Sequence, residues 1–454
     1  MVKQFKEDLG IDISSILIPR ENISLNKWAV IACDQYTSEP EYWESVDKFV
    51  GNEPSTLRLI FPEVYLEREN SEQKKLRIDS INKTMCDYLD NGYFEEIKNS
   101  FIYIERTVKG GKIRKGLLFA IDLEQYDFSK GSDSLIRATE GTILDRLPPR
   151  IQIREKACLE LPHIMLLVDD PDSSIIEPLA CCKKMMNKLY SFDLMMGGGL
   201  IEGYQVNHPE LLQNIYNNLM NLKSQDTFSK KYNVDVSVSP MLFAVGDGNH
   251  SLATAKSCWE NIKKSLSDDE KNFHPARFAL IELVNIHDSA LQFEPIHRIL
   301  FNVDAGKALK YFVKFYSEKG IQCGYEFVDD YKKIPQTDSK KHRVAFINGT
   351  ETGYIWVNEP IFEIDVGTLQ YFLDSFLKEN PEVAIDYVHG TEVVEKLCRN
   401  NSNLGFLLSP MDKSHLFKTV IADGALPRKT FSMGEAEDKR YYLECRKIIP
   451  DYLR

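Results

Sequence analysis

The sequence predicts an α+β protein, and two observations lead to this expectation. The chain has 454 residues, of which 43% are hydrophobic and 27% charged, the composition of a folded globular protein. Apolar runs with strand character are mixed with helical patterns, without strict β–α alternation. At about 150 residues per domain, the length suggests two or three domains. We expect a ligand-binding region over residues 1–300, with an internal break near 133, and a C-terminal α+β domain over residues 301–454.

The net charge of the chain argues against two classes of binding partner, nucleic acid and anionic lipid. Lysine and arginine number 56 against 68 aspartates and glutamates, a formal net charge of −12. Binding to nucleic acid or to anionic lipid needs surplus positive charge, so we expect neither partner. The apolar runs are too short to cross a bilayer, and residues 1–20 lack the apolar core of a signal peptide. Nine scattered cysteines without a C-x-x-C pair are typical of reduced thiols, so we expect a cytoplasmic protein.

The first part of the chain predicts a strand, two helices and a hairpin. Apolar runs indicate buried strands, a capping serine before proline indicates a helix start, and Gly110-Gly111 between two apolar runs indicates a hairpin turn. The expected elements are a strand at 28–33, a helix that Ser38 caps and Pro40 opens, a helix at 69–91, and strands at 101–107 and 116–122.

The middle part predicts alternating helices and short buried strands. The same criteria of periodicity and length separate the two types. The expected elements are a helix at 150–159, a strand at 164–168, helices at 177–190 and 210–222, a strand at 241–245 followed at once by a helix, and a strand at 278–284. Gly197-Gly198-Gly199 predicts a flexible turn.

The last part predicts a smaller α+β arrangement. Asp304 is a good N-cap for the helix that follows it. The expected elements are a helix from 304 to 319, strands at 323–328, 343–348 and 354–357, helices at 367–378 and 392–400, and a strand at 405–408.

The sharpest motif is the turn 247–251, where a buried strand runs into a glycine-framed polar loop and a helix begins at once. The first amides of a helix have no partner within it and, with the helix dipole, attract anions. Gly248 lets the backbone approach a ligand closely. Asp247 would then serve as a general base or Mg²⁺ ligand, and His250 would donate to a phosphate or orient a water. The alternative is a tight turn in which Asp247 or Asn249 caps the helix.

Two groups of basic residues could contact an anion. His297 and Arg298 follow a rigid proline, and Arg146, Arg150 and Arg154 share one helical stripe. The alternatives are a structural role for the first group and a solvated face for the second. Separated charges of both signs are costly to bury unless they meet a ligand or each other, so we expect several to converge on one cleft. These are Asp34, Arg137, Glu140, Asp247, His250 and Arg298.

Several common catalytic signatures do not occur in the sequence. The spacing Gly198-x-x-x-x-Gly203 is followed by Tyr204-Gln205, so it is not a Walker phosphate loop. There is no H-E-x-x-H and no G-x-S-x-G, and the nine histidines do not have metal-ligand spacing.

Several segments, in order, resemble one bacterial and archaeal family, the domain of unknown function one-zero-one-five. Residues 246–255 resemble its hallmark A-D-G-H-H-R-x-x-A, and residues 137–142 resemble its R-x-H-E-x-T segment. The other matching segments are residues 150–171, which resemble R-L-R-L-L-R-A and a later Asp-Asp-Pro, residues 295–298, which resemble P-T-H-R, and residues 426–430, which resemble P-P-K-S-T. The resemblance spans nearly the whole chain.

The D-G-H-H-R box is in turn similar to the second box of the ParB and sulfiredoxin superfamily, where the loop and helix N-terminus bind nucleotide phosphates. Free-serine kinases of that superfamily use its Asp for phosphoryl transfer to a small hydroxyl compound. The resemblance implies a mixed-sheet N-terminal region with a ParB/sulfiredoxin-like strand–turn–helix nucleotide box. It also implies catalytic roles for Asp247 and His250.

The expected phosphate and ligand contacts lie in and around this box. They are Gly248, Asn249, Ser251, Arg137, Glu140, Arg150, His297, Arg298 and Lys429. Asn249 and Ser251 replace the family's first His and its Arg, and losing that Arg removes a charge-assisted contact of about 1.5–3 kcal/mol, which Arg137 or Arg298 could supply. Asp34 and Glu39 are the candidates for a second acidic residue.

These observations favour a nucleotide-dependent phosphotransferase, a small-molecule kinase that acts on a small hydroxylated metabolite. The expected cofactors are Mg²⁺, held by Asp247, and a nucleoside di- or triphosphate. The alternative is a non-catalytic nucleotide- or metabolite-binding sensor on the same scaffold. Both should be stabilised by the ligand, and only the first should consume it.

Overall fold

The computed structural model describes residues 1–66, 68–141, 147–161 and 163–450. These residues form two compact units. Unit 1 comprises Met1–Leu291 and the described residues from Gly434 onward, and unit 2 comprises Gln292–Met433. The expected division at residue 300 assigns residues 434–450 to the C-terminal domain, whereas in the structure they pack in unit 1. No helix in the described ranges is long and apolar enough to cross a membrane.

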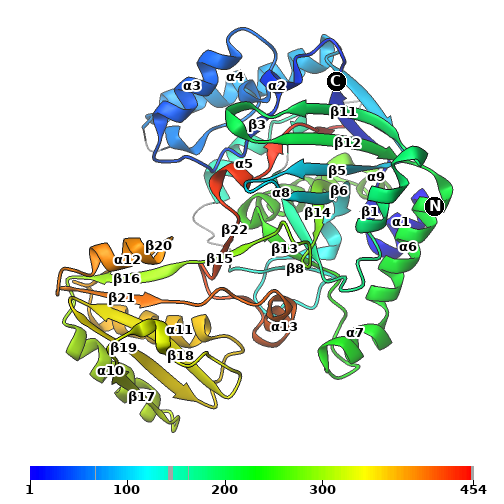
Figure 1. Ribbon diagram of the computed structural model, residues 1–454. Helices are drawn as coiled ribbons and strands as arrows, with labels where there is room; N and C mark the ends of the chain where they lie inside the picture. The colour runs from blue at the N-terminus through cyan, green and yellow to red at the C-terminus, as the bar shows by residue number, and fades with distance from the viewer. Residues whose placement is uncertain (67, 142–146, 162, 451–454) are drawn as a thin grey trace. The chain divides into compact units, whose positions relative to one another are not determined.

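Unit 1 is built on one large mixed sheet (Figure 1). The strands follow the order β11-β12-β5-β6-β14-β10-β13-β8-β7, and β1 pairs with β6 at one side. The pairs β10–β14, β8–β13 and β7–β8 are parallel, and the other pairs are antiparallel. The strand bounds are β1 Ile11–Asp12, β5 Phe101–Thr107, β6 Ile113–Asp122, β7 Tyr126–Asp127, β8 Ile136–Ala138, β10 Met165–Val168, β11 Asn187–Asp193, β12 Leu200–Val206, β13 Phe243–Asp247 and β14 Phe278–Asn285.

Both faces of this sheet are buried, each in its own hydrophobic core. Successive side chains of a strand point to opposite faces, so Leu117 and Leu118 of β6 belong to different cores. The core of Leu117 contains side chains of α1 (Val2–Leu9), α6 (Pro209–Lys223) and α8 (Asn249–Ile262). The core of Leu118 contains side chains of α2 (Leu25–Trp28), α3 (Pro40–Val50) and α4 (Ser71–Asp90).

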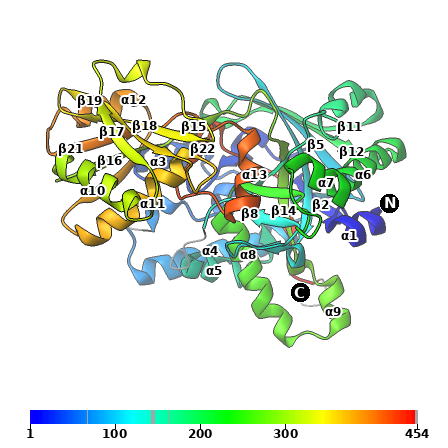
Figure 2. The same ribbon diagram turned by 90° about the horizontal axis from the view of Figure 1, so that it is seen from below.

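Shorter pairings complete unit 1. Strand β2 (Ser15–Pro19) pairs with β4 (Phe94–Lys98). After unit 2 the chain returns, and its last strands β23 (Tyr441–Tyr442) and β24 (Arg446–Lys447) pair with β3 (Val30–Ile31) and β9 (Leu159–Glu160). The other α-helices that the structure describes in unit 1 are α5 (Leu147–Arg154), α7 (Gln225–Tyr232) and α9 (Asp268–Phe273). Helix α5 packs against α8 (Figure 2).

Unit 2 contains a separate antiparallel sheet with the order β17-β19-β18-β21-β16-β20. Phe406 of β21 contacts the ring of Phe372 on α11, whereas the next residue, Leu407, packs with Val394 of α12. Helices α11 and α12 therefore cover opposite faces. The bounds are β15 Phe293–Pro295, β16 His297–Phe301, α10 Ala305–Ser317, β17 Cys323–Phe327, β18 Lys341–Asn348, β19 Glu351–Asn358, α11 Asp365–Glu379, β20 Ala384–Val388, α12 Thr391–Leu397, β21 Asn403–Leu407, α13 Ser414–Asp423 and β22 Phe431–Met433.

The structure confirms that the protein contains both helices and strands in a mixed α/β arrangement. It also confirms many of the helices and strands that the sequence predicts. The hairpin β5–β6, the helices α4, α6 and α10, and the strands β17 to β19 lie where the sequence placed them. The helix predicted at 177–190 is wrong, because Glu177–Met185 is a 3-10 helix and Asn187–Asp193 is strand β11. There, cross-strand packing overrides local preference: the ring of Tyr190 covers Gly203, where a Cβ would lie 2.1 Å from Tyr190 Cζ.

Three predicted boundaries are also corrected. Glu39, not Ser38, is the N-cap of α3, with Pro40 in its first turn. The apolar run at 28–33 contributes only the two-residue strand β3, because Trp28 ends helix α2. In the described residues, the helix predicted at 150–159 spans Leu147–Arg154.

Candidate functional site

The Asp247 turn forms as the sequence predicts. Strand β13 ends at Asp247, Gly248 is the N-cap, and α8 begins at Asn249. Gly248 has φ +79°, and a Cβ there would lie 3.0 Å from the Cα of Ile164, so glycine fits this position on two counts. Asp247 Oδ1 accepts a 3.0 Å hydrogen bond from the Gly248 amide. The first turn of α8 has no acidic side chain, so the positive end of its dipole is not neutralised from within the helix.

A lysine from the returning C-terminal segment faces this turn. Lys439 Nζ lies 3.1 Å from Asp247 Oδ2, and the two side chains are 12% and 23% exposed. Arg106, which is buried, holds the segment in place by donating to the carbonyl oxygens of Glu437, Asp438 and Lys439. Asp247 is therefore one member of an ion pair, and its carboxylate does not cap α8 at the N-cap position, which Gly248 occupies.

His163 connects the helix start to the N-terminal loop. Its Nε2 lies 3.3 Å from Ser251 Oγ and 3.6 Å from Asp34 Oδ2, and its Nδ1 lies 2.6 Å from the hydroxyl of Tyr442. The Tyr442 hydroxyl donates to Cys33 Sγ at 3.1 Å. If Nδ1 carries the ring proton toward Tyr442, Nε2 is left as an acceptor for a hydroxyl group.

The charges of this group act on one another. Burial by itself would raise the pKa of Asp34, but the His163 ring, a hydrogen bond from Gln35 and the Lys439 ammonium together hold it below its ordinary value. Asp34 is therefore a carboxylate at neutral pH. Burial raises the pKa values of the Tyr442 hydroxyl and the Cys33 thiol, so both stay protonated. We call these six residues, Asp34, His163, Asp247, Ser251, Lys439 and Tyr442, the Asp247 site.

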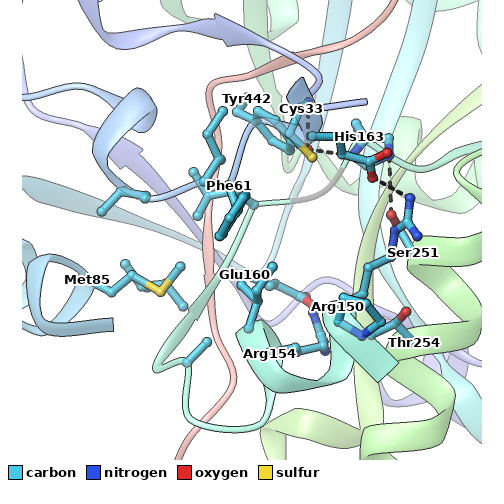
Figure 3. Close-up of a pocket in the computed structure, with 18 of the residues that line it drawn as sticks. Cys33, Phe61, Met85, Arg150, Arg154, Glu160, His163, Ser251, Thr254 and Tyr442 are labelled. Carbon is cyan, nitrogen blue, oxygen red and sulfur yellow. Dashed lines mark hydrogen bonds and ion pairs between the residues drawn. The ribbon is translucent and has the colours of Figure 1, made fainter. Parts of the chain in front are cut away.

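A mainly apolar pocket of about 150 Å³ borders the Asp247 site (Figure 3). His163, Ser251, Cys33 and Tyr442 form one end of the pocket, and Figure 3 shows Met85 at the side away from His163 and Ser251. The other residues that line it are Leu59, Ile60, Phe61, Glu63, Leu66, Pro149, Arg150, Ile153, Arg154, Ala157, Leu159, Glu160, Leu161, Ile164 and Thr254.

Two ion pairs lie in the wall of this apolar pocket. Arg150 pairs with Glu63, and Arg154 Nη2 lies 2.5 Å from Glu160 Oε2. Burial and the nearby Asp34 carboxylate raise the pKa of Glu63 despite the opposing effect of Arg150. The polar part of the wall is thus largely neutralised by pairing, which suits a ligand whose main body is apolar.

The structure brings several predicted site residues together. Asp34, Asp247, Gly248 and Ser251 lie in or next to the Asp247 site, and Arg150 lines the adjoining pocket. Asn249 and His250 begin α8, and Asn249 Nδ2 donates to Thr139 Oγ1 at 3.3 Å. Glu140 is half-buried two residues beyond the end of β8, the neighbour of β13.

Arg137 and Glu39 do not join this group. Arg137 pairs in register with Ala244, and its guanidinium donates to the carbonyl oxygens of Ser134 and Ser239, which precede β8 and β13. Its guanidinium therefore lies at the ends of β8 and β13 opposite to the end that carries Asp247. Along β13, Ala244 and Asp247 are about 10 Å apart. Glu39 is exposed at the start of α3. Arg146 lies outside the described residues.

The remaining predicted residues belong to unit 2. Arg298 is fully buried there and donates to the carbonyl oxygens of Ile296 and Arg428. Burial and the neighbouring Arg298 lower the pKa of His297 to about 4, so its ring is neutral at neutral pH and its Nδ1 accepts from the Leu408 amide. Lys429 is exposed, with φ +57°. The buried contacts of His297 and Arg298 agree with the alternative that these two residues have a structural role.

Sequence reasoning missed His163, Lys439 and Tyr442. His163 stands just before strand β10, and a histidine next to a strand end is a weak signal that was available. Lys439 and Tyr442 follow unit 2 in the chain and carry no local pattern that marks them. Lys439 and Tyr442 join the site only because the C-terminal segment returns to unit 1 after unit 2.

Comparisons with known proteins find distant structural neighbours. Free serine kinase in complex with AMP aligns over 77% of this chain and 96% of its own, with 9% identity and a TM-score of 0.38. A conserved hypothetical protein from Pyrococcus furiosus aligns over 75% and 97%, with 11% identity and a TM-score of 0.37. SbnI from Staphylococcus aureus, truncated at its C-terminus, aligns over 70% and 82%, with 9% identity and a TM-score of 0.33. The search of curated proteins gives no match.

The family comparison is more direct. The model described as "Protein of unknown function (DUF1015)" matches residues 17–376. That range contains the Asp247 turn, His163 and Asp34, and ends within helix α11 of unit 2. The chain therefore belongs to the DUF1015 family.

Proposed function

We propose that this protein is a nucleotide-dependent phosphotransferase that acts on a small hydroxylated compound. The observation that carries the proposal is the Asp247–Lys439 pair at the start of α8. A carboxylate, an ammonium group and the positive end of a helix meet there at one glycine turn. The ammonium and the helix amides suit the phosphates of a nucleotide, and the carboxylate suits the acceptor hydroxyl. The strand–turn–helix would then be a nucleotide box of the ParB/sulfiredoxin type, as the sequence resemblance implies.

The proposed reaction needs positioning and charge neutralisation more than covalent chemistry by the protein. Lys439 would bind a nucleotide phosphate in place of Asp247, and the Asp247 carboxylate would then be available to accept the proton of the substrate hydroxyl. The substrate oxygen forms a bond to the terminal phosphorus as the bond from phosphorus to the nucleotide's bridging oxygen breaks. The hydroxyl proton passes to Asp247, and the nucleotide leaves with one phosphate fewer. Lys439 and the amides of α8 would stabilise the charge on the phosphate oxygens.

Mg²⁺ fits this arrangement as part of the nucleotide complex. The described residues contain no group of three or more His, Cys, Asp or Glu side chains able to hold a metal ion. Protein-bound Mg²⁺ often uses only one or two carboxylates together with substrate phosphates and water. Asp247 would provide such a carboxylate once Lys439 has turned to the phosphates. The ion would neutralise phosphate charge.

The apolar pocket is the proposed place for the acceptor. Its polar end carries His163 and Ser251, with His163 Nε2 3.3 Å from the serine hydroxyl. A substrate hydroxyl at this end would lie beside the Asp247 site, while the rest of the molecule contacts the aliphatic walls. His163 could also receive or orient that proton through Nε2.

A non-catalytic nucleotide- or metabolite-binding sensor is the second candidate. Ser251, in place of the family's arginine, favours it, because a serine hydroxyl attracts phosphate less strongly than a guanidinium. The Asp247–Lys439 pair also gives Asp247 a role without turnover, since each charge neutralises the other.

A binding screen followed by a turnover assay tests both candidates. Melting curves with ATP, ADP, CTP and GTP, each with and without Mg²⁺, should show stabilisation by at least one nucleotide, about 2.7 kcal/mol at 100 times its Kd. Incubation of that nucleotide with a mixture of hydroxylated small molecules, followed by phosphorus NMR, should show a new phosphate ester. Stabilisation without an ester supports the sensor. A protein that no nucleotide stabilises contradicts the phosphotransferase and the nucleotide-binding form of the sensor, and leaves only a sensor that binds another metabolite.

A further inference from the structure

Two cysteines far apart in the sequence meet next to residues that line the apolar pocket. Cys86 lies on α4 and Cys158 lies just before β9, 72 residues later, yet their Sγ atoms are 3.2 Å apart. Neither cysteine is in a disulfide, and their side chains belong to the same hydrophobic core. Cys86 is partly exposed and Cys158 is 2% exposed. One thiol is thus accessible to a small oxidant, and the other is held in contact with it.

We propose that Cys86 and Cys158 are a reversible redox pair that hydrogen peroxide oxidises to a disulfide. The Cys86 thiolate attacks one peroxide oxygen, which forms a sulfenic acid and releases hydroxide as the O–O bond breaks. The Cys158 thiolate then attacks the Cys86 sulfur, so the S–S bond forms and a second hydroxide leaves. The two hydroxides take up the two thiol protons, so two thiols and one peroxide give one disulfide and two waters.

The geometry suits this chemistry. A disulfide has an S–S length of about 2.05 Å, so the two sulfur atoms need to approach by only about 1 Å. The residues beside both cysteines line the apolar pocket: Met85 precedes Cys86, and Ala157 and Leu159 flank Cys158. The bond would tie α4 to the segment between α5 and β9, and so would fix two walls of the pocket to each other. Oxidation of this pair is thus a means of altering the pocket at its apolar end.

Mass spectrometry of the native full-length protein tests the proposal. The protein is treated with hydrogen peroxide, remaining thiols are blocked with iodoacetamide, and the sample is digested without reductant. We expect a linked peptide that joins Cys86 to Cys158 and that dithiothreitol separates. Hydrogen exchange of the oxidised protein should be slower than that of the reduced protein over residues 81–90 and 155–160, because the cross-link restrains both segments.

Single variants supply the controls. Cys86→Ser and Cys158→Ser should each abolish the linked peptide and the change in exchange, whereas Cys181→Ser, at an exposed thiol, should alter neither. The wild-type measurement stands even if one variant fails to fold. The proposal is overturned if peroxide modifies Cys181 while Cys86 and Cys158 remain unlinked in the native protein. It is also overturned if the linked peptide forms only after denaturant is added.

Discussion

Lys439 Nζ lies 3.1 Å from Asp247 Oδ2, although 192 residues separate the two in the sequence. The same ammonium group helps to hold the pKa of Asp34 below its ordinary value, so it acts on two carboxylates. A phosphate that arrives at the start of α8 would compete for this lysine with Asp247. Binding of the anion and release of the carboxylate would then be one event.

Lys439→Met should weaken nucleotide binding by about 10- to 150-fold, because a charge-assisted hydrogen bond is worth about 1.5–3 kcal/mol. Isothermal titration with the nucleotide found in the binding screen measures this. Lys256→Met is a matched control, since Lys256 is similarly buried, lies further along α8 and pairs with Glu260 at 2.9 Å. Equal losses in the two variants would show that Lys439 has no specific role in binding.

Asp247→Asn should fold normally and lose turnover by about 10²–10⁴-fold, the usual effect of losing a general base. Nucleotide affinity should stay the same or rise, because a negative charge near the phosphates disappears while Asn can still accept from the Gly248 amide. Product formation and a melting curve on the same sample give both values. Full turnover in this variant would exclude Asp247 as the catalytic carboxylate.

Ser251→Arg should strengthen nucleotide binding, because it restores the guanidinium of the family pattern at the first turn of α8. The serine it replaces is half-buried beside His163, so the arginine must reach outward from the helix start. A titration with wild type and variant, together with circular dichroism, tests this. Weaker binding with an intact fold would indicate that the site is adapted to another ligand.

Asp365→Asn should stabilise unit 2 at neutral pH. Burial raises the pKa of Asp365 from 3.8 to about 6, so the folded state holds its proton more tightly than the unfolded state does. The stability that this group contributes is therefore complete below pH 4 and is lost as the pH rises from about 4 to 6, by roughly 3 kcal/mol. Asn keeps the acceptor for the 2.8 Å bond from the Val366 amide.

Urea unfolding at pH 4 and pH 7 measures the effect of this substitution. The variant should gain stability over wild type at pH 7 and little at pH 4. Asp304→Asn, at the exposed N-cap of α10, is the control and should change stability at neither pH. A variant of Asp365 that is no more stable than wild type at pH 7 would contradict the assigned burial effect.

The parts of the fold that depend on local pattern could be predicted from the sequence. The strand–turn–helix at Asp247 is one of them, since an apolar run, a glycine and an amphipathic pattern follow one another directly. Strand β11 could not be predicted from local pattern, because it forms by pairing with β12, where the Tyr190 ring lies against Gly203. The sequence predicts Arg137 at the site because separated charges tend to converge on a ligand and because residues 137–142 resemble a family segment, but sequence does not tell which end of a strand a long side chain contacts.

Which residues form the Asp247 site depends on contacts between segments that lie far apart in the sequence. Lys439 reaches Asp247 from a backbone that Arg106 and Arg114 hold by donating to the carbonyl oxygens of residues 437–439. His163 reaches Ser251 because β10 and β13 pair antiparallel, with Met165 opposite Asp247. Long-range pairing of this kind is decided by the packing of the whole sheet.

Because unit 2 is inserted between two parts of unit 1, the order of synthesis matters for this molecule. Unit 2 is one continuous stretch and can fold as soon as it leaves the ribosome, since domains generally fold as units during translation. Unit 1 has to wait, with β3 and β9 lacking their partners until residues 441–447 emerge. Until then Asp247 has no lysine opposite it and His163 has no tyrosine. A nascent chain that stops at residue 433 would hold most of the mass of the protein and neither of these two contacts.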